Sequence, residues 1–159
     1  MDQSVRNLLN KKMKLGGQEL NVSDVLLLAA ITVLAVWVRT AVRSFVAQDW
    51  TDYWSLWLEE LRAGGFKALA GNFYDYAPPV MYLLYLITLL PINSMTAFKA
   101  FCCMLDFVGA GLIGNMVTDC TGSKKRGMLA YGVFLFLPTG ILNAAVWSQC
   151  DIIYTLLIL

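Results

Sequence analysis

Two long apolar runs constrain the fold of this chain more than any other feature. The first extends from Val25 to about Val46, and only Arg39 and Arg43 interrupt it. The second extends from Phe98 to Val117, with Lys99 at its start and Asp106 near its middle. A helix rises 1.5 Å per residue and needs about 20 apolar residues to cross a bilayer, so both runs are long enough. The sequence predicts an all-α, polytopic integral membrane protein.

Composition supports this class and excludes several functions. Apolar residues make up 58% of the chain and charged residues 14%, whereas soluble domains have about 25% charged residues. A net charge of +1 gives no basic field for nucleic acid. The chain has no histidine, and its four cysteines lack zinc-site spacing. We therefore predict no metal and no cofactor, and we expect acid–base chemistry to fall to carboxylates, tyrosines or cysteines.

Charge and hydropathy divide the chain into segments. Residues 1–24 are polar and basic, and the positive-inside rule places them in the cytoplasm. Residues 25–159 form one transmembrane region of about four or five transmembrane or re-entrant helices. Within it, residues 47–78 form the first external loop. The apolar run 152–159 is only the beginning of a span, so we expect a truncated part of a longer polytopic protein.

The topology beyond the first loop has two solutions. The apolar run Val80–Leu90 lies between prolines and is short for a crossing. If it crosses, the basic loop Lys124–Arg126 lies outside, against the positive-inside rule. If it is re-entrant or interfacial, that loop is cytoplasmic and Trp147–Asp151 is external. The charge favours the second solution.

The external loop contains a predicted amphipathic helix. Aromatic and aliphatic residues recur there at helical spacing, and polar residues take the opposite face. Gly64-Gly65 provides a helix stop. Because tryptophan and tyrosine prefer the membrane interface, we expect this helix to lie in it. The apolar face consists of Tyr53, Trp54, Trp57, Leu58 and Leu61.

Charged residues at and just after the C-terminal end of the first predicted helix suggest acid–base catalysis and phosphate binding. Asp49 or Asp52 could act as a general base on an acceptor hydroxyl. Arg39 and Arg43 lie four residues apart on one helix face. They could hold a phosphate at the membrane surface, or could simply extend to lipid headgroups.

Two further polar groups interrupt apolar sequence. Asp106 lies within a span, where an ionisable group marks either a functional site or a hydrogen bond between packed helices. Trp147-Ser-Gln-Cys-Asp151 is a polar patch between apolar runs. It could form the wall of a wet cavity or an ordinary loop.

The order of these motifs resembles the N-terminal part of the GT-C-fold glycosyltransferases that use polyprenyl-phosphate sugars. The nearest likeness is to bacterial membrane proteins related to the GPI mannosyltransferases. The resemblance rests on Asp49-Trp50, Gly64-Gly65-Phe66, Tyr76-Ala-Pro78-Pro79, Lys99 with Asp106, and Trp147-Ser-Gln149-Cys-Asp151. The family's glycines before the loop aspartate and within the tryptophan patch are Gln48 and Ser148 here.

The resemblance implies a function and a set of site residues. The chain would transfer a hexose, plausibly mannose, from a polyprenyl-phosphate carrier to a lipid or glycan acceptor outside a bacterial plasma membrane. Asp49 would be the base, with Asp52 second, and Arg39 and Arg43 would hold the carrier phosphate. The remaining substrate-binding residues would be Tyr76, Pro78, Pro79, Asp106, Trp147, Gln149 and Asp151.

A non-enzymatic membrane protein, such as a transporter fragment or a scaffold subunit, is the alternative. In that case Arg39, Arg43 and Asp106 would form a substrate path or packing contacts.

Overall fold

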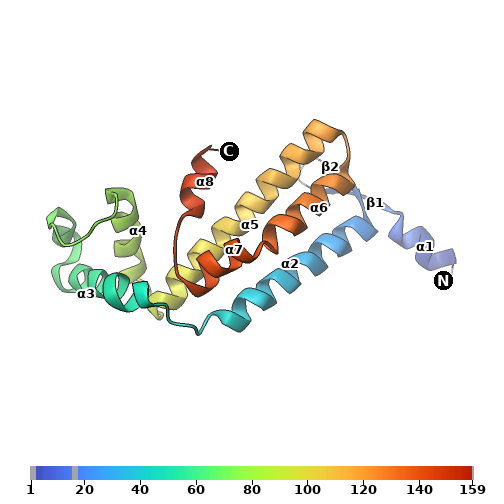
Figure 1. Ribbon diagram of the computed structural model, residues 1–159. Helices are drawn as coiled ribbons and strands as arrows, with labels where there is room; N and C mark the ends of the chain where they lie inside the picture. Colours follow the sequence, from blue (N-terminus) through green and yellow to red (C-terminus); the bar gives the residue numbers. More distant parts are fainter. Residues whose placement is uncertain (1–2, 16–17, 159) are drawn as a thin grey trace.

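The computed structural model describes residues 3–15 and 18–158, and it is mostly helical (Figure 1). Three helices, α2, α5 and α6, form an elongated bundle, while α3 and α4 form a separate lobe at one end. In chain order the elements are α1 (Gln3–Leu9), β1 (Lys12–Leu15), β2 (Gln18–Asn21), α2 (Val22–Val42), the π-helical turn η1 (Trp50–Trp54), α3 (Ser55–Gly64), the 3-10 helix η2 (Gly65–Ala70), α4 (Pro78–Thr88), α5 (Ser94–Thr121), α6 (Lys124–Leu135), α7 (Pro138–Ile141), the π-helical turn η3 (Leu142–Val146) and α8 (Ile152–Ile158).

The long apolar helices identify an integral membrane protein. Among the described residues, α2 and α5 are each long and apolar enough to cross a bilayer. The stretch from α6 through Val146 is a third candidate, bent by 47° at the break before Pro138. Proline explains this bend, because its ring cannot continue the preceding helical hydrogen bonding. The described residues therefore hold two or three candidate crossings, and α4, with 11 residues, is too short to be another.

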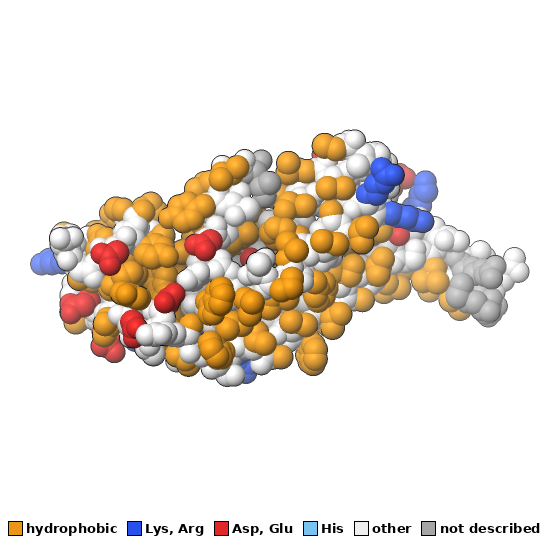
Figure 2. Space-filling view, viewed as in Figure 1, with side chains coloured by type: hydrophobic (Ala, Val, Ile, Leu, Met, Phe, Trp, Pro, Cys, Tyr) orange, Lys and Arg blue, Asp and Glu red, His pale blue; other side chains and the backbone are white. Residues whose placement is uncertain are grey.

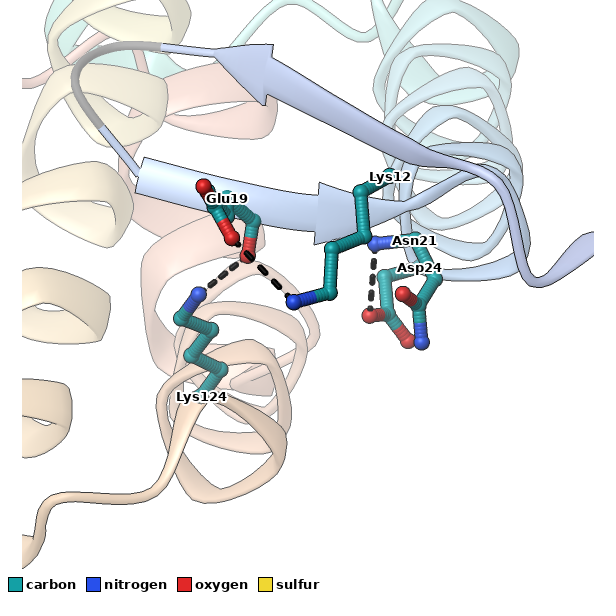
Figure 3. A network of polar contacts seen from close by, with 5 residues as sticks. All are labelled: Lys12, Glu19, Asn21, Asp24 and Lys124. Carbon is teal, nitrogen blue, oxygen red and sulfur yellow. Dashed lines mark hydrogen bonds and ion pairs between the residues drawn. The ribbon is translucent and has the colours of Figure 1, made fainter.

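The prediction of an all-α fold was wrong at the N-terminus. Strands β1 and β2 pair antiparallel there and form a two-stranded hairpin before α2. Lys12 Nζ lies 3.3 Å from Glu19 Oε2 across the hairpin (Figure 3). The backbone N–H of Asn21 then donates to Asp24 Oδ2 at 3.2 Å, where α2 begins. The alternating apolar and polar residues of Lys12–Leu15 are a strand pattern of period two, masked in the sequence by the overall basic charge.

Both basic segments lie at one end of the bundle. Lys124 Nζ donates to the backbone carbonyl of Glu19, so the segment joining α5 to α6 lies beside the hairpin (Figure 3). Figure 2 shows basic side chains at this end and most of the visible acidic ones near α3 and α4. This geometry agrees with the topology in which Val80–Leu90 does not cross. Lys124–Arg126 forms the first turn of α6 rather than a loop.

Small residues let α5 and α6 approach closely. A Cβ added at Gly127 would lie 2.5 Å from the carbonyl oxygen of Gly114 and 1.9 Å from Thr118 Oγ1. Only glycine fits such a contact, which is a common device for packing helices in membranes. One turn further along α6, the hydroxyls of Tyr131 and Thr32 lie 2.8 Å apart and tie α6 to α2.

The lobe after α2 has an aromatic core. A helix in this loop was predicted, and α3 confirms it, ending at Gly65 with φ 60°. Its apolar face packs on protein, because Trp54 and Trp57 are buried against α4 and Phe98. Tyr53, expected on that face, is half exposed because the π-helical turn before α3 shifts the register.

Candidate functional site

A small cavity lies where the aromatic lobe meets the segment after η3. Gln149 Nε2 donates to Asp49 Oδ2 at 3.0 Å and joins residues that are 100 positions apart. The cavity is open to solvent and has a volume of about 200 Å³. Its lining contains three residues singled out from the sequence, Asp49, Tyr76 and Gln149, together with Tyr53, Trp54, Trp57 and Asp75.

Four aromatic rings make up much of the cavity wall. The centroid of Trp54 lies 5.2 Å from that of Trp57 and 5.0 Å from that of Tyr76. Trp57 lies 5.8 Å from Tyr76 and 6.0 Å from Tyr53. These separations and tilted or edge-on arrangements are favourable for aromatic pairs. The cluster gives the cavity a firm apolar wall beside its carboxylates.

The segment carrying Gln149 has unusual backbone. Ser148 has φ 60°, a left-handed conformation that favours glycine. The backbone N–H of Gln149 donates to the carbonyl of Asn143 at 3.0 Å and closes the turn. Ser148 is fully buried, and its hydroxyl has no hydrogen-bond partner among the described residues. Glycine would adopt this conformation without the steric cost that serine has.

The surroundings of Tyr76 are electrically negative. Burial is the main cause that raises the pKa of the Tyr76 phenol above its ordinary value of 10.0. The acidic groups of Cys150, Asp151 and Asp49 raise this pKa further. Tyr76 therefore stays protonated near neutral pH and can donate a hydrogen bond into the cavity.

Arg39 and Asp106 form a buried ion pair in the bundle. Arg39 Nη2 lies 3.1 Å from Asp106 Oδ2, and both side chains are about 5% exposed or less. Arg39 Nη1 also donates to the carbonyl of Leu135 at 3.0 Å, near the C-terminus of α6. The guanidinium lies 5.3 Å from the ring centroid of Phe107. One side chain thus joins α2, α5 and α6, which is a packing role for both charges.

Arg43 and Lys99 lie near the same end of α2 but differ in their contacts. Lys99 is buried and donates to the backbone carbonyls of Arg43 and Phe45, at 3.0 and 2.5 Å. These carbonyls follow the last turn of α2, where a cation is favoured. The Arg43 side chain is exposed and borders a groove of about 740 Å³ between α2 and α5. The other groove residues include Val36, Met104 and Phe107.

The remaining predicted residues lie around the cavity rather than in it. Asp52 is exposed, and its carboxylate accepts from Thr51 Oγ1 at 3.2 Å. Pro78 and Pro79 are exposed in the first turn of α4, so they fix the start of that helix directly after Tyr76. Trp147 and Asp151 line a neighbouring hollow of about 340 Å³, where Asn143 Nδ2 donates to Asp151 at 3.3 Å.

Sequence reasoning missed Asp75 and the tryptophans as cavity residues. Asp75 stood in the run Phe73-Tyr74-Asp75-Tyr76, so the signal was an acidic residue between aromatic ones. Trp54 and Trp57 were assigned to the membrane interface, because tryptophan is common there, and so they were not predicted to line a cavity. Within residues 3–15 and 18–158, no group of three acidic or cysteine side chains could hold a metal ion.

The chain matches no protein-family model, no curated protein and no solved structure. The likeness to the GT-C enzymes therefore rests on the sequence motifs alone.

Proposed function

We propose that this protein is a membrane glycosyltransferase, or the N-terminal part of one, of the GT-C type. It would transfer a hexose, plausibly mannose, from a polyprenyl-phosphate carrier to a lipid or glycan acceptor. Its N-terminus would be cytoplasmic, and the Asp49 cavity would face the outside of a bacterial plasma membrane. The charge distribution supports this orientation, because basic residues gather beside the N-terminal hairpin.

The convergence of Asp49, Tyr76 and Gln149 on one aromatic-walled cavity carries the proposal. Carboxylate, amide and phenol groups are hydrogen-bonding partners for sugar hydroxyls, and aromatic side chains offer apolar surface to a ring. A volume of about 200 Å³ lies below the ~300–1,000 Å³ typical of drug-sized ligands, so a single small ring is the natural occupant.

The chemical step follows from the position of Asp49. The acceptor hydroxyl oxygen attacks the anomeric carbon, and the bond from that carbon to the phosphate oxygen breaks. Asp49 takes the acceptor proton, and the lipid phosphate leaves with the bonding electrons. Gln149 donates a hydrogen bond to Asp49 Oδ2, and Asp49 Oδ1 would accept the proton.

Arg43 is the cation best suited to the carrier phosphate. Arg39 is occupied by Asp106, and Lys99 by backbone carbonyls. Arg43 lies exposed beside a groove with apolar residues that suit a lipid chain. We therefore narrow the phosphate-binding role from the arginine pair to Arg43, and we assign Arg39 to packing.

The test is a transfer assay on the purified chain in lipid nanodiscs, with radiolabelled polyprenyl-phosphate hexoses and membrane lipid acceptors. Asp49→Asn should reduce turnover about 100-fold or more, since a positioned base contributes about 10²–10⁴-fold. Asp52→Asn tests the second candidate and should have a much smaller effect. Glu60→Gln, an exposed change on α3, is the matched control and should leave turnover unchanged.

Two outcomes would count against the proposal. Normal turnover by Asp49→Asn would remove Asp49 as the base. Absence of both transfer and saturable donor binding, measured through tryptophan fluorescence, would favour a non-enzymatic scaffold or transporter part. The Arg39–Asp106 pair is compatible with that alternative, since it serves packing in either case.

A further inference from the structure

The charge of the Asp49 cavity differs from that of the rest of the protein. Two carboxylates, Asp49 and Asp75, lie in its lining, and the lining contains no lysine or arginine. Among the described residues, neither carboxylate forms a salt bridge. In the described part of the chain, the Asp49 carboxylate has one polar partner, the neutral amide of Gln149, at 3.0 Å.

Nearby groups reinforce this negative field. Trp147 and Asp49 border an adjoining hollow that also has no basic residue in its lining. Burial raises the pKa of Tyr76 most, and the nearby carboxylates of Asp151 and Asp49 raise it further. The basic residues of the chain gather chiefly at the opposite end of the bundle (Figure 2). The cavity lining therefore offers no cation to an anionic ligand group.

The aromatic wall adds a second attraction for a cation. The rings of Tyr53, Trp54, Trp57 and Tyr76 follow one another at centroid distances of 5.0 to 6.0 Å. Aromatic rings attract organic cations within about 6 Å through their quadrupole, and tryptophan does so most strongly. Cages of aromatic side chains bind quaternary ammonium groups for this reason. A ligand bound by hydrogen bonds alone would not require an aromatic cluster next to two carboxylates that form no salt bridge among the described residues.

We propose that the Asp49 cavity binds a group carrying an ammonium charge, held between the carboxylates of Asp49 and Asp75 and the Trp54–Trp57–Tyr76 rings. The inference rests on the proposed function only in taking this cavity as the ligand site. If the protein is a transferase, the group belongs to the acceptor or to an amino sugar, because the carrier phosphate is anionic. The ammonium group can come from a lipid headgroup or from a free amine, since the shared chemistry is the positive charge.

The test compares choline with 3,3-dimethyl-1-butanol, a neutral molecule of the same shape. The full chain is placed in nanodiscs of phosphatidylglycerol, which has no ammonium group, and binding is followed by tryptophan fluorescence. Choline should bind saturably and at least about tenfold more tightly than the neutral alcohol, a difference of ~1.4 kcal/mol. Added salt should weaken choline binding and leave the alcohol unaffected.

Variants locate the charge that is responsible. Asp75→Asn and Asp49→Asn should each weaken choline binding about tenfold and leave binding of the alcohol unchanged. Glu60→Gln removes one negative charge from the same lobe outside the cavity and should change neither. Circular dichroism spectra identical to that of the unsubstituted chain exclude misfolding as the cause of any loss.

Further binding measurements identify the source of the ammonium group. They also test the inference independently of the proposed transfer reaction. Tighter binding of glucosamine than glucose points to an amino sugar, whereas competition by phosphatidylcholine or phosphatidylethanolamine nanodiscs points to a lipid headgroup. Equal affinity for choline and the neutral alcohol, or no saturable binding of choline, overturns the inference. Glucose binding without any choline preference would overturn the inference and leave the glycosyltransferase proposal standing. A choline preference without glucose binding would support the inference and count against the glycosyltransferase proposal.

Discussion

The helical bundle and the aromatic lobe place their charged residues in opposite surroundings. In the bundle, Arg39 and Asp106 are buried together, and the arginine also satisfies the carbonyl of Leu135. In the aromatic lobe, Asp49 and Asp75 are exposed at a cavity and have no basic partner among the described residues. Removing either member of the buried pair would leave the other charge without its partner, so the pair fixes the arrangement of the helices. A carboxylate open to a cavity has no such constraint, so the comparison separates acids used for packing from acids that face open space.

Breaking the bundle's ion pair should have the largest effect. Arg39→Met leaves the Asp106 carboxylate buried without its cation, which costs about 3–5 kcal/mol. We expect a loss of this size in the free energy of unfolding, measured by denaturant titration in mixed micelles. The double variant Arg39→Met/Asp106→Leu should recover much of the loss. Equal destabilisation of the single and double variants would contradict a coupled pair.

The close contact of α5 and α6 should be the next most sensitive point. Gly127→Ala places a Cβ 1.9 Å from Thr118 Oγ1 and 2.5 Å from the Gly114 carbonyl oxygen, so the helices must separate. Overpacking of this kind costs about 1–3 kcal/mol. Gly111→Ala is the matched control on α5, because a Cβ there meets nothing within 4 Å. The same unfolding titration compares the two, and similar losses would rule out steric contact as the cause.

In the lobe, the expected effects are smaller and one is stabilising. Ser148→Gly relieves a left-handed φ and removes a buried hydroxyl without a partner, so stability should rise by about 1 kcal/mol. Ser148→Ala separates the two causes, since it removes only the hydroxyl. Thermal unfolding of the three proteins measures the order. A destabilised glycine variant would indicate that the hydroxyl has a partner in solution.

The smallest effect concerns the pH dependence of Tyr76. Because the pKa of Tyr76 is raised in the folded protein, the unfolded chain loses this proton first as pH increases. The contribution of Tyr76 to stability is therefore intact below pH 10.0 and declines above it. Tyr76→Phe should show a shallower decline in unfolding free energy between about pH 9 and 11. Parallel curves for both proteins would show that folding does not raise the pKa of Tyr76.

The sequence was informative about elements with a strong local signal. The apolar runs of α2 and α5, the helix stop at Gly65 and the helical spacing in α3 were all readable. The short hairpin before α2 was missed, because a strand of four residues has too few positions to reveal its period against a basic composition. Tyr53 was misplaced because a π-helical turn cannot be read from the 3.6-residue pattern.

The candidate site was only partly readable for a related reason. Asp49, Tyr76 and Gln149 were each identified from a separate motif, and the motifs did not show that the three lie together. Two residues that were predicted to share one role have different surroundings in the fold. Arg39 and Arg43 share a helix face by spacing, yet Arg39 is buried on Asp106 while Arg43 stays exposed. Asp75 gave a weak signal, since one acidic residue in a loop is usually only solvated.

Composition and hydropathy by themselves determined that this is a membrane protein, because crossing a bilayer depends on local length and apolarity alone. The tertiary structure decided which charges are used for packing and which line an open cavity. Partners such as Asp49 with Gln149 and Arg39 with Asp106 are 100 and 67 positions apart, and no local pattern encodes a contact over that distance. Only the packing of α2 against α5 and α6, and of the lobe against the segment after η3, brings them together.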